Sequence, residues 1–373
     1  MDLAGRNVWQ VAAGDNKRRY DDICLEYDVM MIGSGELGPF DENTYRDKKD
    51  SSKNAIRRFY RELKLGDLVL LRLGTREVLA VGEVAGDQAA HMEEFGDIDG
   101  WRLQHTRRVR WVRATKQFAG SKFRGRFGGV WQPEVLEWVR AFRYPVETPS
   151  RTLLDLPMDT GKLSDEELGA QLAENGMPVQ RVARLLATME SVRPLIEWYR
   201  AQQEKRSGRP SEHETITYLV VPLLFSLGWS EKTLAIEWRS MDMALFDEAG
   251  LGALHPACAI EVKSLDKSVF APKEQAVSYA EREHCERFFV TDGVRYACFR
   301  KEADEYVPGS YLNITRLRHS YPAYHDRARG HCGGAVDSLL SMARSSHASE
   351  PPALTDENHP QHHKPSGHEP RGV

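Results

Sequence analysis

The stretch CAIEVKSLDKSVFAPKEQAVSYA, residues 258–280, decides the fold of the C-terminal half of this chain. Its first residues are apolar enough for a strand inside a sheet, yet Glu261 and Lys263 interrupt them. Alternate residues of a strand share one face, so these two side chains project together. A buried charge is costly unless it is paired or holds a metal. The pattern therefore predicts either a structural ion pair or an active site.

Segments on both sides of this stretch alternate between helix and strand patterns. Helices are expected at residues 211–228 and 272–283, and strands at 240–247, 257–264, 286–291 and 294–300. Ser211 and Glu214 form a capping box at the start of the first helix, and Asp292-Gly293 is a hairpin turn. This order predicts an α/β domain with a mixed sheet.

Acidic and basic residues converge in such a domain. Asp242 begins one expected strand, and Glu261 and Lys263 end the next, so an adjacent pairing would bring the three together. Two carboxylates suit a hard cation such as Mg²⁺, and a neighbouring lysine can position or deprotonate a water molecule. This set is chemically sufficient to hydrolyse a phosphodiester; the alternative is a structural Glu–Lys pair at a sheet edge.

Residues on the helices flanking these strands strengthen the first interpretation. Gln275 and Tyr279 are four positions apart, on one face of a helix, and could bond to a metal site or a DNA backbone. Glu214 has a capping role, which leaves Glu212 free to point elsewhere.

The segments SEHETITYLVVPLLFSLGW, MDMALF, AIEVK, EQAVSYA and FFVTDGVRYACF together resemble the PD-(D/E)xK nuclease domain of type I restriction R subunits, over residues 211–300. The resemblance implies a restriction-endonuclease-like α/β fold at residues 208–344, with Mg²⁺ on Asp242 and Glu261. It implies a catalytic set of Glu212, Asp242, Glu261, Lys263, Gln275 and Tyr279. Met243 departs from the family, which often has an aromatic residue there.

Residues 1–145 read as a small, mostly β domain with one helix at 53–63. The runs NVWQVAAGD, VMMIGSGELGPF, LKLGDLVLLRLGTREVLAVGEVAGD and WRLQHTRRVRW resemble EVE-like β-barrel domains of the PUA superfamily, over about residues 7–115. The resemblance implies a pocket for an extruded modified base near Asp15, Ser34 and Trp101. Many relatives have an aromatic residue where this chain has Ser34.

A basic stretch follows, because residues 107–126 carry eight lysines and arginines without an acidic residue, although the net charge of the chain is −4. Aromatic residues are interleaved, as is typical of a surface that follows phosphates; the alternative is a solvated basic face. The predicted DNA-backbone contacts are Arg107, Arg108, Arg110, Lys122, Arg124 and Arg126.

The remaining predictions concern organisation and partners. Residues 146–207 are expected to form a helical linker and residues 345–373 a disordered tail. No signal-peptide pattern opens the chain, which favours a cytoplasmic protein, and no P-loop motif indicates a nucleotide triphosphate. Five scattered cysteines suggest neither disulfides nor zinc, and no segment is apolar enough for a membrane.

Together these features predict a modification-dependent restriction endonuclease that recognises a modified base in DNA, such as 5-methylcytosine, and cuts nearby with Mg²⁺. Cutting both strands with one active site per chain favours a homodimer. Two alternatives stay open: a non-catalytic reader of modified nucleic acid, and a nuclease acting on modified RNA or single-stranded DNA.

Overall fold

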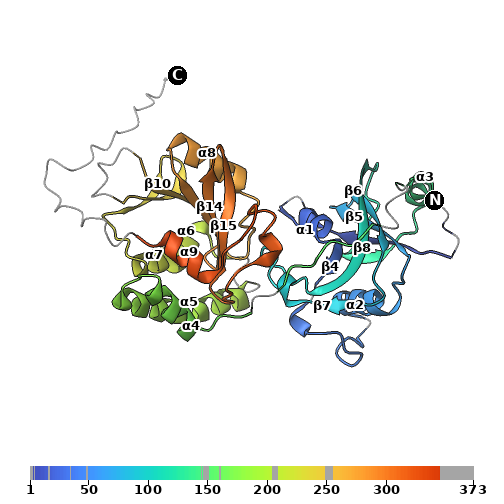
Figure 1. Cartoon of the computed structure of the whole chain (residues 1–373), viewed down its shortest axis with the longest axis horizontal. Helices are drawn as coiled ribbons and strands as arrows, with labels where there is room; N and C mark the ends of the chain where they lie inside the picture. Colours follow the sequence, from blue (N-terminus) through green and yellow to red (C-terminus); the bar gives the residue numbers. More distant parts are fainter. Residues whose placement is uncertain are drawn as a thin grey trace, which may run out of the picture.

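The computed structural model describes residues 3–344, apart from 4, 16, 34, 48, 144, 146–150, 159, 160, 204–208 and 248–254. Within these residues the chain forms two α+β units, each built on its own sheet, which lie side by side along the long axis of the molecule (Figure 1). Ser34 and the predicted tail at 345–373 lie outside the described residues.

The N-terminal unit is built on a curled, mostly antiparallel sheet. Its strands are β1 (Val8–Ala12), β4 (Val29–Ile32), β5 (Leu68–Leu73), β6 (Glu77–Val84), β7 (Ala90–His91), β8 (His105–Gln117) and β9 (Phe127–Gly129). In the described part of the chain their order is β4-β8-β6-β5-β1-β9, with β7 paired to β8. β1 and β5 run parallel, and β5 is buried along its whole length. This curled sheet agrees with the strand-like runs in this part of the sequence.

Short helices and a hairpin complete this unit. They are α1 (Asp21–Glu26), α2 (Ser51–Arg61), α3 (Pro133–Ala141) and the hairpin β2–β3 (Gly14–Asp15 with Arg18–Arg19). The predicted helix at 53–63 corresponds to α2, which begins after Asp50 because that side chain accepts hydrogen bonds from the Ser52 and Lys53 amides. Ile56 and Phe59 of α2 are buried in the core.

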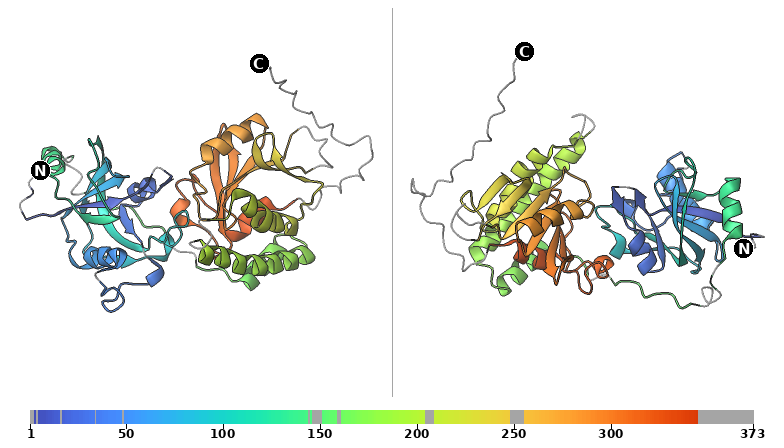
Figure 2. Two further views of the ribbon diagram at one scale, coloured as in Figure 1. Left: turned by 180° about the vertical axis from the view of Figure 1, so that it is seen from behind. Right: turned by 90° about the horizontal axis from the view of Figure 1, so that it is seen from above.

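The C-terminal unit contains a mixed sheet in which the strands follow chain order. They are β10 (Leu234–Trp238), β11 (Met241–Leu245), β12 (Cys258–Val262), β13 (Arg287–Thr291), β14 (Arg295–Glu302) and β15 (Glu305–Asn313). β12 and β13 run parallel, and α8 (Lys273–Arg282) connects them; the other neighbours are antiparallel. Both views in Figure 2 show α8 on the side of the sheet opposite the long helices. The mixed sheet predicted from the sequence is present.

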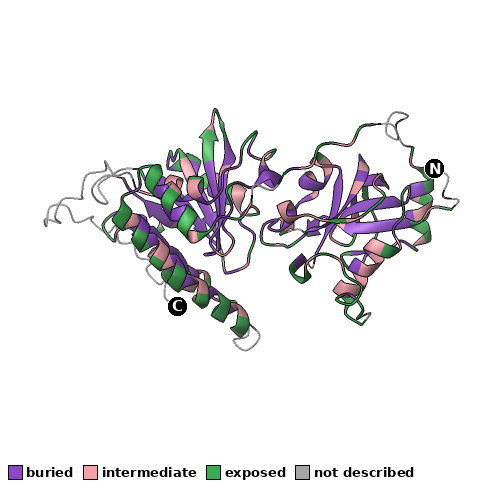
Figure 3. Cartoon of the chain, turned by 60° about the horizontal axis from the view of Figure 1, so that its bottom comes forward, coloured by how far each residue is buried: buried purple, intermediate pink, exposed green. Residues whose placement is uncertain are grey.

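Helices cover the other face of this sheet. They are α4 (Asp165–Glu174), α5 (Val179–Gln202), α6 (Glu212–Thr215), the π-helical turn η4 (Ile216–Val220), α7 (Val221–Ser226) and α9 (Ala335–Met342). The capping box predicted at Ser211 is formed, and Ser164 forms another with Glu167 at the start of α4. Leu168 of α4 and Leu185 of α5 share one core cluster with Leu223 of α7. The helices predicted as a linker are therefore packed into the C-terminal unit, with their buried sides toward the sheet (Figure 3).

The two units share a core across their boundary. Tyr20 of the first unit belongs to the same hydrophobic cluster as Tyr311 and Tyr324 of the second, and Trp101 packs against that cluster. The hydroxyl of Tyr324 donates a 3.0 Å hydrogen bond to the carbonyl oxygen of Asp97. This contact fixes the segment around Asp97 against the C-terminal sheet.

Candidate active site and nucleic-acid pocket

The carboxylates of Asp242 and Glu261 meet on neighbouring strands. β11 pairs antiparallel with β12 so that Met243 lies opposite Ile260, and this register places Asp242 beside Glu261 on the same face. Asp242 Oδ2 accepts a 2.6 Å hydrogen bond from the Val262 amide, which fixes that side chain. The pairing expected from the sequence is therefore formed.

Lys263 completes this cluster. Its ammonium group donates a hydrogen bond to Glu261 Oε1 and lies 3.9 Å from Glu212 Oε1. The Lys263 amide donates to the Thr291 carbonyl over 2.7 Å, so the residue continues the parallel pairing just past the end of β12. Glu212 reaches the cluster from the first turn of α6, whose N-cap is Ser211. Glu212, Asp242, Glu261 and Lys263 thus converge from three elements.

Burial and the close carboxylates shift the pKa values of Glu261 and Lys263. Glu261 is only 3% exposed, and burial raises the pKa of its carboxyl group, with Asp242 and Glu212 adding repulsion. Burial opposes the charged form of Lys263, but the bond to Glu261 and the nearby carboxylates outweigh it and raise the pKa of the ammonium group. Lys263 is therefore a firmly protonated donor, suited to positioning an anion or a water molecule.

Gln275 and Tyr279 lie apart from this cluster. They share one face of α8, as predicted, and Gln275 Nε2 donates a 3.1 Å hydrogen bond to the hydroxyl of Tyr279. Within the described residues, neither side chain bonds to Asp242, Glu261 or Lys263. Gln275 is exposed and Tyr279 is half-buried, so the pair is open to solvent at least at Gln275.

The carboxylates of this cluster would hold a metal ion only together with water ligands. Three carboxylates face one ammonium group, so the side chains carry a net negative charge. Across the described residues, no group of three or more His, Cys, Asp and Glu side chains is arranged as a metal site. Mg²⁺ commonly binds through one or two carboxylates and keeps several waters, so Asp242 and Glu261 fit it as a pair.

A second candidate site is a cavity of about 720 Å³ in the N-terminal unit. Its walls include Asp15 and Trp101 of the predicted base pocket, together with Gly14 and Gly33. Asp15 Oδ1 accepts hydrogen bonds from the Lys17 and Arg18 amides, so this carboxylate also holds the β2–β3 turn. The predicted pocket residues that are described thus line one cavity, whose size suits a small ligand.

Trp101 forms a partly exposed wall of this cavity. Its ring meets Tyr20 edge-on, with centroids 5.5 Å apart, and the Arg18 guanidinium lies 5.0 Å from its centroid. Tyr20 is itself fixed by a 2.7 Å hydrogen bond from its hydroxyl to the Ala12 carbonyl. The indole is therefore held in a set orientation.

Arg72 is a cavity residue that the sequence alone did not predict. It is 4% exposed, and its guanidinium donates to the Gln10 side chain and to the carbonyls of Gly74 and Gly125. In the described part of the chain it has no ion pair with a carboxylate, and burial lowers its pKa to about 10. A buried cation bound only to neutral acceptors favours a ligand that carries carbonyl or anionic oxygen. The sequence feature that could have indicated Arg72 is its position as a charged residue within the apolar run LVLLRL.

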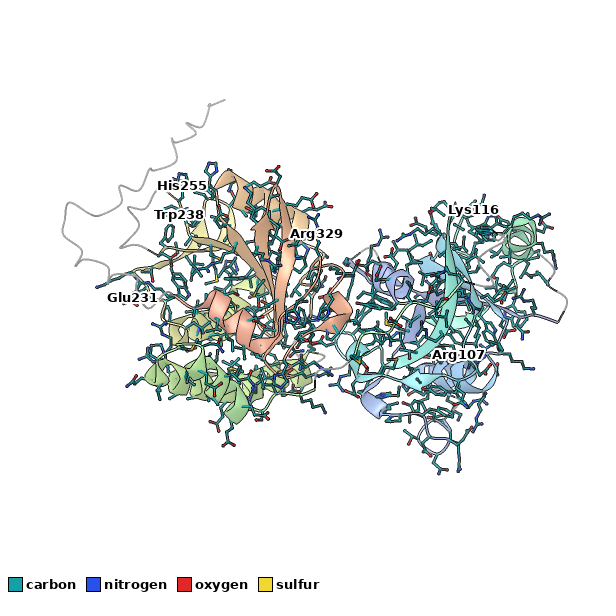
Figure 4. The ribbon with its side chains drawn as sticks, viewed as in Figure 1. Arg107, Lys116, Glu231, Trp238, His255 and Arg329 are labelled. Atoms are coloured by element: carbon teal, nitrogen blue, oxygen red, sulfur yellow. The ribbon has the colours of Figure 1, made fainter. Side chains whose placement is uncertain are left out.

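The arginines at the start of the basic stretch, residues 107–126, donate hydrogen bonds to carbonyl groups of the chain itself. Arg107 is buried and donates to the carbonyls of Gly86 and Asp87, Arg108 donates to Leu154, and Arg110 donates to Arg151. These three guanidinium groups therefore bind the chain itself. Figure 4 shows Arg107 and Lys116 toward opposite ends of β8.

Residues at the end of the basic stretch line the 720 Å³ cavity instead. Lys122 forms a 2.6 Å ion pair with Glu134. Arg124 and Arg126 are exposed and line the cavity. Of the six predicted DNA-backbone contacts, Arg124 and Arg126 are therefore the two that are exposed beside the cavity.

Comparison with known proteins concerns the N-terminal unit. Residues 9–127 match the model of a family described as a domain of unknown function (DUF8426). All residues that line the 720 Å³ cavity fall within this range. The carboxylate–lysine cluster of Glu212, Asp242, Glu261 and Lys263 lies outside it. No curated protein matches the chain. No helix in the described residues has the length and apolar character needed to cross a membrane.

Proposed function

We propose that this protein is a modification-dependent endonuclease, in which the N-terminal cavity holds an extruded modified base of DNA and the carboxylate–lysine cluster hydrolyses a nearby phosphodiester. The observation that carries the proposal is the convergence of Glu212, Asp242, Glu261 and Lys263, because their register matches the D…ExK order of PD-(D/E)xK nucleases. The curled N-terminal sheet with its cavity is what an EVE-like reader would need.

Each residue of the cluster has a defined task in this proposal. Asp242 and Glu261 would hold Mg²⁺, which supplies charge stabilisation at a phosphate oxygen. The protonated Lys263 donates to the phosphate or orients the attacking water, since its raised pKa disfavours loss of a proton. Glu212 lies 3.9 Å from that ammonium group and helps to keep it charged.

The cavity has groups that distinguish a base. Trp101 offers a stacking face, and Arg72 offers a buried donor for an oxygen on the edge of the base. Phosphate, metal and water carry no sequence information, so selectivity belongs to the cavity. The ligand proposed is a modified cytosine; its O2, which plain cytosine also carries, can accept from such a donor.

A digestion series tests the proposal. Duplexes of one sequence, carrying cytosine, 5-methylcytosine, 5-hydroxymethylcytosine or glucosylated cytosine, are incubated with the full chain and Mg²⁺. Cleavage of at least one modified duplex and not of the plain one supports the proposal. Binding of modified DNA without cleavage of any substrate favours a non-catalytic reader, and cleavage confined to RNA or single-stranded DNA favours the other alternative.

A further inference from the structure

A second cavity, of about 500 Å³, lies between the two units and is lined by arginines. Six of its lining residues are arginine and three are acidic: Arg18, Arg102, Arg200, Arg209, Arg295 and Arg316, with Asp97, Glu197 and Asp266. The lining side chains alone sum to +3, and two of these arginines, Arg18 and Arg295, also pair with Asp99 and Asp292 outside the lining. We call this cavity the arginine groove.

Part of this charge is compensated and part is not. Arg200 pairs with Asp266 at 3.0 Å and with Glu197 at 2.8 Å. In contrast, neither Arg102 nor Arg316 forms an ion pair within the described residues; Arg316 donates only to the Gly96 carbonyl, at 2.8 Å. Burial lowers the pKa of Arg316; the charge of Asp97 opposes this shift, and the charges of Arg102 and Arg200 add to it. A bound anion would relieve this repulsion.

A buried donor also lines the groove without a partner. Arg295 is 2% exposed and binds Asp292, but its Nη1 atom has no hydrogen-bond acceptor among the residues that the structure describes. Nη1 packs against Gly100, where a Cβ atom would approach it to 1.5 Å, and Gly100 lines the groove as well. A buried N–H group without an acceptor is unfavourable, so this atom is a second, independent indication of a ligand.

The groove adjoins the cavity of the N-terminal unit, and its other end is lined by residues close in sequence to the carboxylate–lysine cluster. Gly100, Trp101 and Arg102 line both cavities. At the other end, Arg209 donates a 3.0 Å hydrogen bond to the carbonyl of Asp266. Asp266 follows Lys263 by three residues, and Arg209 precedes Glu212 by three. One end of the groove is therefore shared with the cavity proposed to hold the base, and the other lies three residues along the chain from two residues proposed to cut.

We propose that the arginine groove binds the sugar–phosphate backbone of the nucleic-acid strand whose base enters the N-terminal cavity. This inference rests on the proposed function and adds to it a path for the strand between the two sites. It implies a fixed number of nucleotides between the modified base and the cleaved bond, because both ends of the groove are anchored in the protein. Backbone binding here is independent of sequence.

The test uses the full chain and a short labelled oligothymidylate, which carries no modification. The variants are Arg102→Glu and Arg316→Gln; the second lines the groove but not the base cavity and keeps a donor near the Gly96 carbonyl. Matched controls are Arg46→Glu and Arg184→Gln, at exposed positions outside the groove. Thermal unfolding checks that all four variants are folded.

The groove variants are expected to bind the oligonucleotide more weakly and to flatten the slope of log Kd against log salt by about 0.7 for each phosphate that is no longer bound. The controls are expected to keep the wild-type slope. Groove variants with wild-type affinity and slope would overturn the inference. Weakened oligothymidylate binding in a protein that neither prefers nor cuts modified DNA would uphold the groove and refute the proposed function.

Discussion

The carboxylate of Asp99 accepts a hydrogen bond from the hydroxyl of Ser268, although 169 positions separate the two residues. Asp99 also accepts a 2.9 Å bond from the Val269 amide. Asp99 precedes Trp101 of the base cavity by two residues, and Ser268 follows Lys263 by five. The buried Asp99–Ser268 contact therefore connects the segment that contains Trp101 with the segment that follows Lys263.

Ser268→Ala is expected to destabilise the protein by about 1–3 kcal/mol, because it leaves the buried Asp99 with one donor fewer. Burial raises the pKa of Asp99, whereas the Ser268 bond lowers it. A raised carboxyl pKa means that the folded protein binds more protons than the unfolded chain, so stability falls as pH rises through that range. The difference in unfolding free energy between wild type and variant should therefore be larger at pH 7 than at pH 4. A constant difference, or an effect equal to that of the exposed control Ser278→Ala, would contradict this assignment.

Glu261→Gln is expected to raise the thermal stability of the metal-free protein while removing cleavage. The pKa of Glu261 is raised, so its ionised form opposes folding above its ordinary pKa, and a neutral amide of the same shape removes that penalty. Each kcal/mol gained corresponds to about 2–4 °C in Tm. Adding Mg²⁺ should raise the Tm of wild type and not that of the variant. An equal response of both proteins to Mg²⁺ would place the metal elsewhere.

Trp101→Ala is expected to weaken binding of modified DNA by about 5- to 150-fold, because it removes a stacking interaction of about 1–3 kcal/mol. Binding of plain DNA should change little. Trp101→Phe is the matched control, because it keeps an aromatic face beside Tyr20 and Arg18. Equal weakening on modified and plain DNA, measured by fluorescence anisotropy, would assign Trp101 to the inter-unit packing alone.

Charge reversal of Arg124 and Arg126 should weaken binding to modified and plain DNA alike, since both guanidinium groups are exposed at the rim of the cavity. The salt slope should become shallower by about one unit for each phosphate that the variant no longer binds. Reversal of Arg113, which is exposed on β8 and does not line the cavity, is the control. Slopes that stay at the wild-type value would mean that these arginines do not contact phosphates.

Local signals in the sequence predicted much of the C-terminal unit. Ser211 and Glu214 start α6, and Asp292-Gly293 forms the β13–β14 turn, because capping and turn chemistry depend on residues only a few positions apart. The alternation around Glu261 placed its carboxylate on the same face as Asp242, once β11 and β12 paired. Spacing along the chain was sufficient in these cases.

The remaining features depend on contacts between distant segments. Nothing near Asp99 indicates that it meets Ser268, and nothing near Arg295 indicates a guanidinium atom packed against Gly100. The helices at 165–202 read as a connection because their buried faces match partners that only the folded sheet supplies. Arg107 read as a surface charge, since the carbonyls that bind it belong to a loop about twenty residues away.

In the proposed function, one chain both selects a modified base and cuts with Asp242, Glu261 and Lys263. The most direct measurement is the Mg²⁺-dependent cleavage rate on two duplexes that differ only by one modified cytosine, for wild type and for Lys263→Ala. Wild type should cut the modified duplex alone, and the variant should cut it about 100- to 1,000-fold more slowly while still binding it. Cleavage by Lys263→Ala at the wild-type rate, or equal cleavage of both duplexes by wild type, would contradict the proposed function.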